Sequence, residues 1–345
     1  MSGAPVYRVV VESSGRNGAW LVDRAADFAD RRLFAAALAT DRDGTVPSTL
    51  LDEMRDLGLF GLFSPSGVGG HDLEPSDRYR IIEVLAGGCL TTTFVWLQHA
   101  GPAAATAGAS GPAHAFAEPL ASGRCTGGVA FAHLLRSGPP TLTVSANGDE
   151  WVLNGFAPYV TGWGWIDVVL VAARSGGEIV WLLLDAVEAA SLRASRLQLA
   201  AVDSSQTAAV TFDDHIVSSD RLVRIDRYAD WLVGYRAGLR ANGSLALGVA
   251  GRCARLLGDG DLAHQVDSAR SALDAADTDG LPAARSEASL LAMRAATMLV
   301  TSKAGRSVMG DDHAQRLARE AMFLLVQGQT SEIRQHQLAM LRSAP

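Results

Sequence analysis

The spacing of apolar residues changes twice along this chain and divides it into three parts. In the first part apolar residues recur every three to four positions, which is the spacing of a helix with one buried face. In the second part short apolar runs alternate with turn residues, which predicts strands. The third part returns to helical spacing. The pattern predicts a helical domain over residues 1–125, a central β-domain over 126–224 and a C-terminal helical domain over 225–345.

Both helical parts divide into several segments. The predicted N-terminal helices are 18–40, 47–60, 74–88 and 90–108, and the predicted C-terminal helices are 226–258, 261–277, 282–308 and 312–342. Gly280-Leu-Pro282 and Gly310-Asp-Asp312 separate the last three of these, because glycine and proline end helices. Long consecutive helices with short breaks indicate an antiparallel four-helix bundle.

The central part predicts seven short strands. They are 129–131, 141–144, 151–153, 159–161, 168–172, 180–184 and 208–212. Short strands at this spacing are typical of a small β-barrel or sandwich. The predicted fold class is therefore α+β and multidomain, with the β-domain between an all-helical domain and a four-helix bundle.

One predicted hairpin carries candidate chemistry. Asn154-Gly155 lies between two apolar runs, which is a strong short-range signal for a tight turn. Tyr159 and Thr161 follow two residues apart, so a strand would place them on one face. A flat ring beside a hydroxyl suits a flat, hydrogen-bonding heterocycle. An ordinary sheet hairpin without a ligand is the alternative.

Composition removes several classes of function. The net charge of −7 and the lack of a basic stripe argue against nucleic acid as a partner. No run of about 18 uncharged apolar residues predicts a membrane span, and the N-terminus lacks the layout of a signal peptide. Cys89, Cys125 and Cys253 are odd in number and far apart, which predicts reduced cysteines in a cytoplasmic protein, with no disulfide and no metal site.

The segment 151–167 resembles the central β-domain of the acyl-CoA dehydrogenase family, which reads V-L-N-G-x-K-x-W/Y-I-T-x-x-x-x-A-D. Residues 57–70, 210–217 and 317–333 resemble three further motifs of that family, and the resemblance covers about residues 20–342. It implies the order helices, sheet, four-helix bundle. It also implies FAD as cofactor, an acyl-CoA or carrier-bound acyl substrate, and a homo-oligomer or a hetero-oligomer with a related subunit.

The resemblance also implies site residues. In the family the aromatic residue packs against the flavin ring and the threonine contacts it, which are the roles of Tyr159 and Thr161 here. The positions that the resemblance places at the flavin are Phe131, His133, Tyr159, Thr161, Gly162, Thr330 and Glu332.

The family's catalytic base is missing. Residues 317–333 resemble L-x-R-D-A-x-x-x-x-I-Y-E-G-T-x-x-I, and Gly328 stands at the position of the catalytic Glu. Some relatives carry the base on the first bundle helix, but residues 237–240 hold no carboxylate either. Glu332 and His133 are the nearest candidates for a substitute, with a solvated helix acid and a structural histidine as the alternatives. A positioned base contributes about 10²–10⁴-fold to such a reaction.

Three segments that would hold the dinucleotide also depart from the family, at 135–140, 255–261 and 309–313. Three functions therefore stay open. The first is a flavin-linked oxidoreductase acting on the CH–CH group of an acyl thioester. The second is a non-catalytic subunit that pairs with an intact homologue. The third is a flavin-dependent monooxygenase on the same fold, which needs no base for the α-proton.

Overall fold

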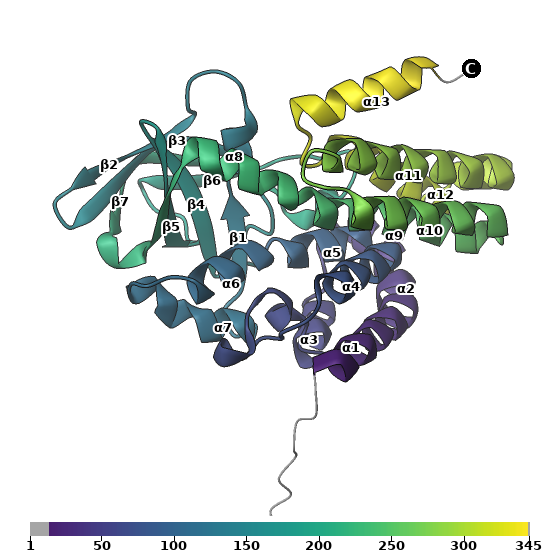
Figure 1. Ribbon diagram of the computed structural model, residues 1–345, viewed down its shortest axis with the longest axis horizontal. Helices are drawn as coiled ribbons and strands as arrows, with labels where there is room; N and C mark the ends of the chain where they lie inside the picture. The colour runs from purple at the N-terminus through teal and green to yellow at the C-terminus, as the bar shows by residue number, and fades with distance from the viewer. Residues whose placement is uncertain (1–13, 344–345) are drawn as a thin grey trace, which may run out of the picture.

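The computed structural model describes residues 14–343. Helices, a sheet and helices follow one another along the chain (Figure 1), so the predicted fold class is confirmed. The N-terminal helices are α1 (Ser14–Phe28), α2 (Phe34–Asp43), α3 (Ser48–Asp56), α4 (Pro75–Gly88), α5 (Leu90–Leu97), α6 (Ala100–Ala107) and α7 (Ala117–Ala121). A π-helical turn, Ala29–Leu33, joins α1 to α2.

The predicted helix over 90–108 is wrong as a single helix, since it bends between α5 and α6. Pro102 lies in the first turn of α6, where a continuous helix would press its ring against the carbonyl of Gln98. The buried His99 fixes the bend. Its Nε2 bonds the Leu120 carbonyl at 2.9 Å, and the Gly127 N–H donates to its Nδ1 at 3.0 Å. The bend is thereby tied to the first strand of the sheet.

The strands are β1 (Gly127–Ala130), β2 (Leu142–Asn147), β3 (Glu150–Val160), β4 (Val168–Ser175), β5 (Glu178–Asp185), β6 (Leu192–Arg196), β7 (Ala208–Ser218) and β8 (Leu222–Arg227). They form one sheet in the order β6-β7-β3-β2-β4-β5-β8, with β1 parallel to β4. One pairing, Thr143 with Arg174, joins the two halves of the sheet. Apolar residues of both halves, such as Val144, Val171 and Phe212, share one core, as expected of a sandwich.

The predicted turn at Asn154-Gly155 is wrong, because both residues lie inside β3. The hairpin turns at Gly148-Asp149 instead, and Asn154-Gly155 forms a bulge where the register of β3 against β7 shifts. The Asn154 side chain exchanges hydrogen bonds with Asp214 of β7. Gly155 has φ +120°, and a Cβ there would overlap the Thr141 carbonyl. The Asn154-Gly155 dipeptide therefore forms a β-bulge and not a turn.

Other strand predictions also need correction. The predicted strands 151–153 and 159–161 are two ends of β3, and β6 and β8 were missed. β6 (Leu-Arg-Ala-Ser-Arg) and β8 (Leu-Val-Arg-Ile-Asp-Arg) are the two ends of the sheet order and carry charges on their open sides. Edge strands commonly carry charge, which hides them from a search for apolar runs.

β4 and β5 are buried on both faces. One face joins the core of the sheet, and the other packs on α6, α7 and the segment between them through residues such as Leu170, Trp181 and Leu120. Figure 1 shows α6 and α7 beneath the sheet. This double burial explains why both strands read as continuous apolar runs.

The C-terminal helices are α8 (Tyr228–Ala237), α9 (Leu239–Leu257), α10 (Gly260–Ala275), α11 (Leu281–Lys303), α12 (His313–Val326) and α13 (Ser331–Ser343). Helices α9 to α12 lie together as a bundle, and α13 packs on α11 at the top of the view (Figure 1). The predicted helix 226–258 is wrong as one element, because it breaks at Gly238. The predicted helix 312–342 likewise breaks at 327–330, where Gly328 takes a left-handed conformation.

Among residues 14–343, no helix has the length and apolar character needed to span a membrane. Cys89, Cys125 and Cys253 are all free thiols.

A buried ion pair lies where the bundle meets the N-terminal helices. Arg316 and Glu320, one turn apart on α12, are both almost completely buried and are 2.5 Å apart. Arg319 on the same helix pairs with Asp41 of α2. Burying two charges gives little net stability, but removing one partner leaves the other without compensation.

Glu320→Ala should therefore lower the free energy of unfolding by about 3–5 kcal/mol. The double variant Arg316→Met/Glu320→Leu should lose much less, because it removes both charges. Asp27→Ala is the matched control, since Asp27 of α1 forms an exposed pair with Arg31 of the π-helical turn, four residues on. Chemical denaturation of the four proteins measures the difference. A double variant as unstable as Glu320→Ala would contradict the explanation.

Candidate functional site

A cavity of about 540 Å³ lies where the helical domain, the sheet and the bundle meet. This volume falls within the range of small-molecule sites. Its walls come from α5 and α6, from β1 and β3 with the segments that follow them, and from α8, α9 and the end of α12. The lining residues are Phe94, Leu97, Gln98, Gly101, Val129, Phe131, Ala132, Leu135, Tyr159, Thr161, Leu199, Thr207, Tyr235, Asn242, Phe323, Val326, Gln327 and Gly328.

Tyr159 of β3 and Thr161 of the turn that follows it both line this cavity. The Tyr159 ring is 52% exposed, which is unusual for a ring on an apolar wall. Thr161 is buried, and its hydroxyl bonds that of Thr207 at 2.9 Å, which in turn bonds Ser205 at 2.8 Å. An uncovered aromatic face beside a row of hydroxyls is suited to a flat polar ligand.

Phe131 also lines the cavity. Its ring stands edge-on to Tyr235, with centroids 5.8 Å apart, and to Trp231 at 6.0 Å. These contacts tie the end of β1 to α8, so the wall is held by packed rings from two domains.

His133 and Gly162 lie outside the cavity lining. His133 is buried against β4, where its Nε2 bonds the Ala172 carbonyl at 2.7 Å while its Nδ1 has no partner in the described part of the chain. Burial lowers the pKa of His133 to about 4. Gly162 donates its N–H to the Ser205 carbonyl at 2.9 Å and shapes the turn after β3. Their contact with a cofactor stays a prediction.

Thr330 and Glu332 are also not among the lining residues. Thr330 Oγ1 accepts the Ile333 N–H at 3.3 Å and caps α13. Glu332 forms an ion pair with Arg236 of α8, which also bonds Asp279 at 3.1 Å. Neither substitute base proposed from sequence, Glu332 or His133, is brought to the cavity wall.

Gly328 does reach the wall, at the point where α12 ends. It has φ +60°, a left-handed conformation that favours glycine. Its carbonyl accepts the Tyr235 hydroxyl at 3.3 Å, and a Cβ at residue 328 would lie 3.0 Å from Asn242 Nδ2. The N–H groups of Gln327 and Gln329 already donate to carbonyls of α12.

Tyr235 and Asn242 were missed by sequence reasoning. They are seven residues apart, a spacing that places two residues on one face of a helix. Both residues lie in the predicted helix 226–258, where this spacing would place them on one face. Neither side chain is a carboxylate, so neither is a candidate for the base.

None of the lining residues, all within the described range, is charged. Burial raises the pKa of Tyr235 to about 12, although the Arg285 charge opposes the rise, so the phenol stays protonated at neutral pH. Arg285 is fully buried, and its Nη2 donates to the Leu324 and Gln327 carbonyls at 3.0 and 3.5 Å. Burial lowers its pKa to about 10, so it remains a cation. No carboxylate of the described chain pairs with it.

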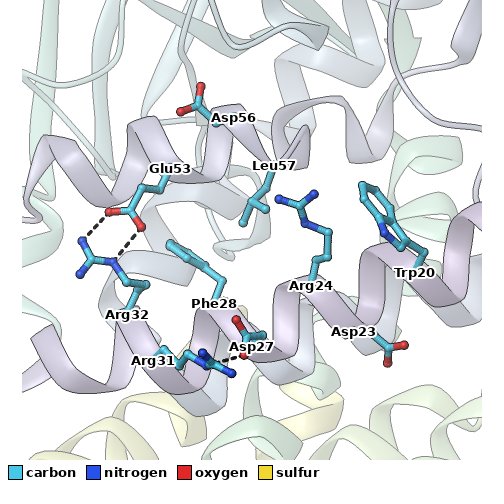
Figure 2. Close-up of a pocket in the computed structure, with 10 residues that line it drawn as sticks. All are labelled: Trp20, Asp23, Arg24, Asp27, Phe28, Arg31, Arg32, Glu53, Asp56 and Leu57. Atoms are coloured by element: carbon cyan, nitrogen blue, oxygen red, sulfur yellow. Dashed lines mark hydrogen bonds and ion pairs between the residues drawn. The ribbon is translucent and has the colours of Figure 1, made fainter.

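A second cavity, of about 570 Å³, lies between α1 and α3. Figure 2 shows Trp20 and Arg24 of α1 on one side and Glu53 of α3 bonded to Arg32 on the other. Two ion pairs, Arg31 with Asp27 and Arg32 with Glu53, lie on its wall, and it contains none of the residues predicted from sequence. The cavity at Tyr159 is therefore the candidate site.

A family model described as "Acyl-CoA dehydrogenase, N-terminal domain" matches residues 19–124. Human mitochondrial short-chain specific acyl-CoA dehydrogenase is 28% identical over 148 residues, which are 41% of this chain and 36% of that protein. Residues 19–124 thus match this family's N-terminal domain, and the chain is similar to acyl-CoA dehydrogenases.

A further relative extends the comparison. The 3-sulfinopropanoyl-CoA desulfinase of Variovorax paradoxus is 26% identical over 162 residues, 44% of this chain and 39% of that protein. The matches quoted thus span less than half the length of these curated relatives.

Solved structures match over nearly the whole chain. Butyryl-CoA dehydrogenase from Megasphaera elsdenii has a TM-score of 0.81 at 19% identity, covering 96% of this chain and 100% of that one. A glutaryl-CoA dehydrogenase from Mycobacterium smegmatis, solved with FADH2, has a TM-score of 0.79 at 15% identity, covering 95% of each chain. Because the sequence identities are only 19% and 15%, the similarity to these two structures shows a shared fold and nothing further.

The conformation of Gly328 has a testable consequence for stability. Gly328→Ala should destabilise the protein by about 1–2 kcal/mol, because the new Cβ meets a left-handed φ and the Asn242 amide. Gly234→Ala is the matched control. Gly234 lies inside α8 with open space around it, so alanine should be neutral or slightly stabilising there. Equal thermal shifts in the two variants would contradict this account.

The buried His133 predicts a loss of stability in mild acid. Its pKa is about 4 when folded and near 6.5 when unfolded, so the unfolded chain binds the proton first as the pH falls. The loss for this residue is about 2 kcal/mol between pH 7 and pH 5. His133→Gln should flatten that part of the stability curve, while His336→Gln, at an exposed position of α13, should not. Denaturant titrations at both pH values make the comparison.

Proposed function

We propose that this protein is a flavin-linked oxidoreductase of the acyl-CoA dehydrogenase type, acting on the CH–CH group of an acyl thioester. The observation that supports it best is the uncovered Tyr159 ring beside buried Thr161 on the wall of an uncharged cavity. The flavin ring would lie against these two residues. Phe94, Leu97 and Phe323 give the opposite side an apolar surface suited to an acyl chain.

The residues present fit the ring of the cofactor better than its diphosphate. At the proposed position of the flavin ring, the cavity wall offers the aromatic face of Tyr159 and the hydroxyls of Thr161 and Thr207. No cationic side chain of the described residues lines the cavity to meet a phosphate. Segment 135–140, which would hold the diphosphate by resemblance, lacks the family's acid as well. FAD is therefore the proposed cofactor, with its diphosphate held partly by backbone groups or by a second subunit.

Bound FAD would supply an acceptor for hydride from the β-carbon. The chain's own residues bind and orient the two ligands and exclude water from between them. They do not supply a base, because the only titratable side chains on the wall are Tyr159 and Tyr235. The Tyr235 phenol is protonated at neutral pH and can donate a proton but not accept one. Dehydrogenation by this chain alone should therefore be about 10²–10⁴-fold slower than with a positioned carboxylate.

Purified protein tests the proposal directly. It should carry or bind FAD, with a visible flavin spectrum, and an acyl-CoA should bleach that spectrum slowly. A protein that binds neither FAD nor acyl-CoA would contradict the proposal.

Tyr159 tests the placement of the ring. Tyr159→Ala should weaken FAD binding about two- to tenfold through the loss of ring stacking, while Tyr159→Phe should stay near wild type. Trp20→Ala is the matched control, because Trp20 is an equally exposed ring on the second cavity. Fluorescence titration with FAD measures all three. Equal affinity for Tyr159→Ala and wild type would contradict the placement.

The missing base keeps two other functions open. A non-catalytic subunit would be colourless alone and would gain flavin only when purified with a related subunit. A flavin-dependent monooxygenase would oxidise added reduced flavin rapidly in air and hydroxylate its substrate. One relative, the 3-sulfinopropanoyl-CoA desulfinase, is named for a reaction other than dehydrogenation, so by analogy this fold need not be tied to dehydrogenation.

Exposed apolar side chains favour an oligomer. A groove of about 1220 Å³ runs along α10 and α11 to α13 and includes Met298, Met340 and Leu341. We place the contact with a second copy or a related subunit there. Light scattering of the pure protein would show whether it is a monomer.

A further inference from the structure

Two phenylalanine rings meet at the cavity wall. Phe94 of α5 and Phe323 of α12 both line the cavity, and their rings stand edge-on, with centroids 5.1 Å apart and planes at 73°. This arrangement is favourable for two aromatic rings, so each ring helps to hold the other in place. Phe94 is also buried, which leaves its ring little room to move aside in a close-packed interior.

Both helices continue past this pair, but the cavity does not. Residues 90–93, the preceding turn of α5, are buried and lie outside the lining. The preceding turns of α12 pack into the core through residues such as Leu317 and Ala321, and they also lie outside the lining. On each helix the first residue that lines the cavity is thus a phenylalanine. The ring pair therefore marks a closed end of the cavity.

Polar groups of the wall gather at the other end of the α12 contact. The Tyr235 hydroxyl donates to the Gly328 carbonyl at 3.3 Å. The Gln327 side-chain amide donates to Asn242 Oδ1 at 3.4 Å. Because polar groups favour polar surroundings, the thioester and its CoA chain should lie at this end. The hydrocarbon end of the acyl group should then point toward the ring pair.

The distance between these two ends limits the length of the acyl group. Phe323 and Gln327 are four residues apart in the chain, which corresponds to a helical rise of about 6 Å. An extended chain of carbon atoms advances roughly 1.2 Å per bond, much as an extended backbone does. The space between the polar end and the rings therefore suits an acyl group of about four to six carbon atoms.

We infer that Phe94 and Phe323 restrict this protein to short acyl groups by closing the cavity at the end away from Gly328. This inference rests on the proposed function, because it assumes that an acyl thioester enters the cavity. A longer chain would have to separate the two rings or fold back on itself. The two phenylalanines are thus specificity-determining residues for the length of the acyl chain.

A series of unbranched acyl-CoAs tests the inference. The affinity of the FAD-loaded protein is measured for butyryl-, hexanoyl-, octanoyl- and dodecanoyl-CoA, each in competition with butyryl-CoA so that binding elsewhere on the surface does not count. While the chain still fits, each added methylene should tighten binding about fourfold. In wild-type protein this gain should stop at about six carbon atoms. Dodecanoyl-CoA should then bind no more tightly than hexanoyl-CoA.

Phe94→Leu and Phe323→Leu should each move this limit. Leucine is smaller than phenylalanine by about three carbon atoms, so octanoyl-CoA should bind either variant about tenfold more tightly than hexanoyl-CoA. Phe63→Leu is the matched control. Phe63 packs against Trp96 of the same helix α5 but does not line the cavity, so its loss should leave the limit unchanged.

Affinity that rises steadily up to dodecanoyl-CoA in wild-type protein would overturn the inference alone. A limit that stays at the same chain length in both leucine variants would do so as well. If Phe323→Leu fails to fold, Phe94→Leu decides between the outcomes. Failure of FAD-loaded wild-type protein to bind any of the four acyl-CoAs would overturn the proposed function and the inference together.

Discussion

The left-handed turn at Gly328 is the constraint on which the candidate site depends. It ends α12 at the cavity wall and turns the last carbonyls of that helix toward Arg285 and Tyr235. Because residue 328 has no side chain, Asn242 and Tyr235 approach the backbone more closely than a larger residue would allow. The shape of this part of the wall follows from the turn.

The architecture could be predicted from the sequence because it depends on repeated apolar spacing. β4 and β5 are examples, since burial on both faces gives long apolar runs that tolerate little else. The places where a helix bends or a strand bulges depend instead on single residues, and the same residue type occurs in more than one kind of local structure. Pro102 divides α5 from α6, and Asn154-Gly155 forms a bulge although the same dipeptide is common in turns. The charged edge strands β6 and β8 lack the apolar signal altogether.

The candidate site was predictable only in part, for a related reason. Tyr159 and Thr161 lie close together in sequence, so they reach the same cavity although Thr161 lies just beyond the end of β3. Tyr235, Asn242 and Gly328 come together through the packing of α8, α9 and α12, which no local pattern encodes. Glu332 and His133 are residue types that can act as a base. In the structure, however, Glu332 is paired with Arg236, and His133 Nε2 is bonded to the Ala172 carbonyl.

The crowding around Gly328 also limits which residues position 328 accepts. A glutamate there would meet both the left-handed backbone and the side-chain amide of Asn242. Its cost would depend on how far Asn242 shifts, so the effects of substitutions at 328 and 242 on stability are expected to be coupled and not additive.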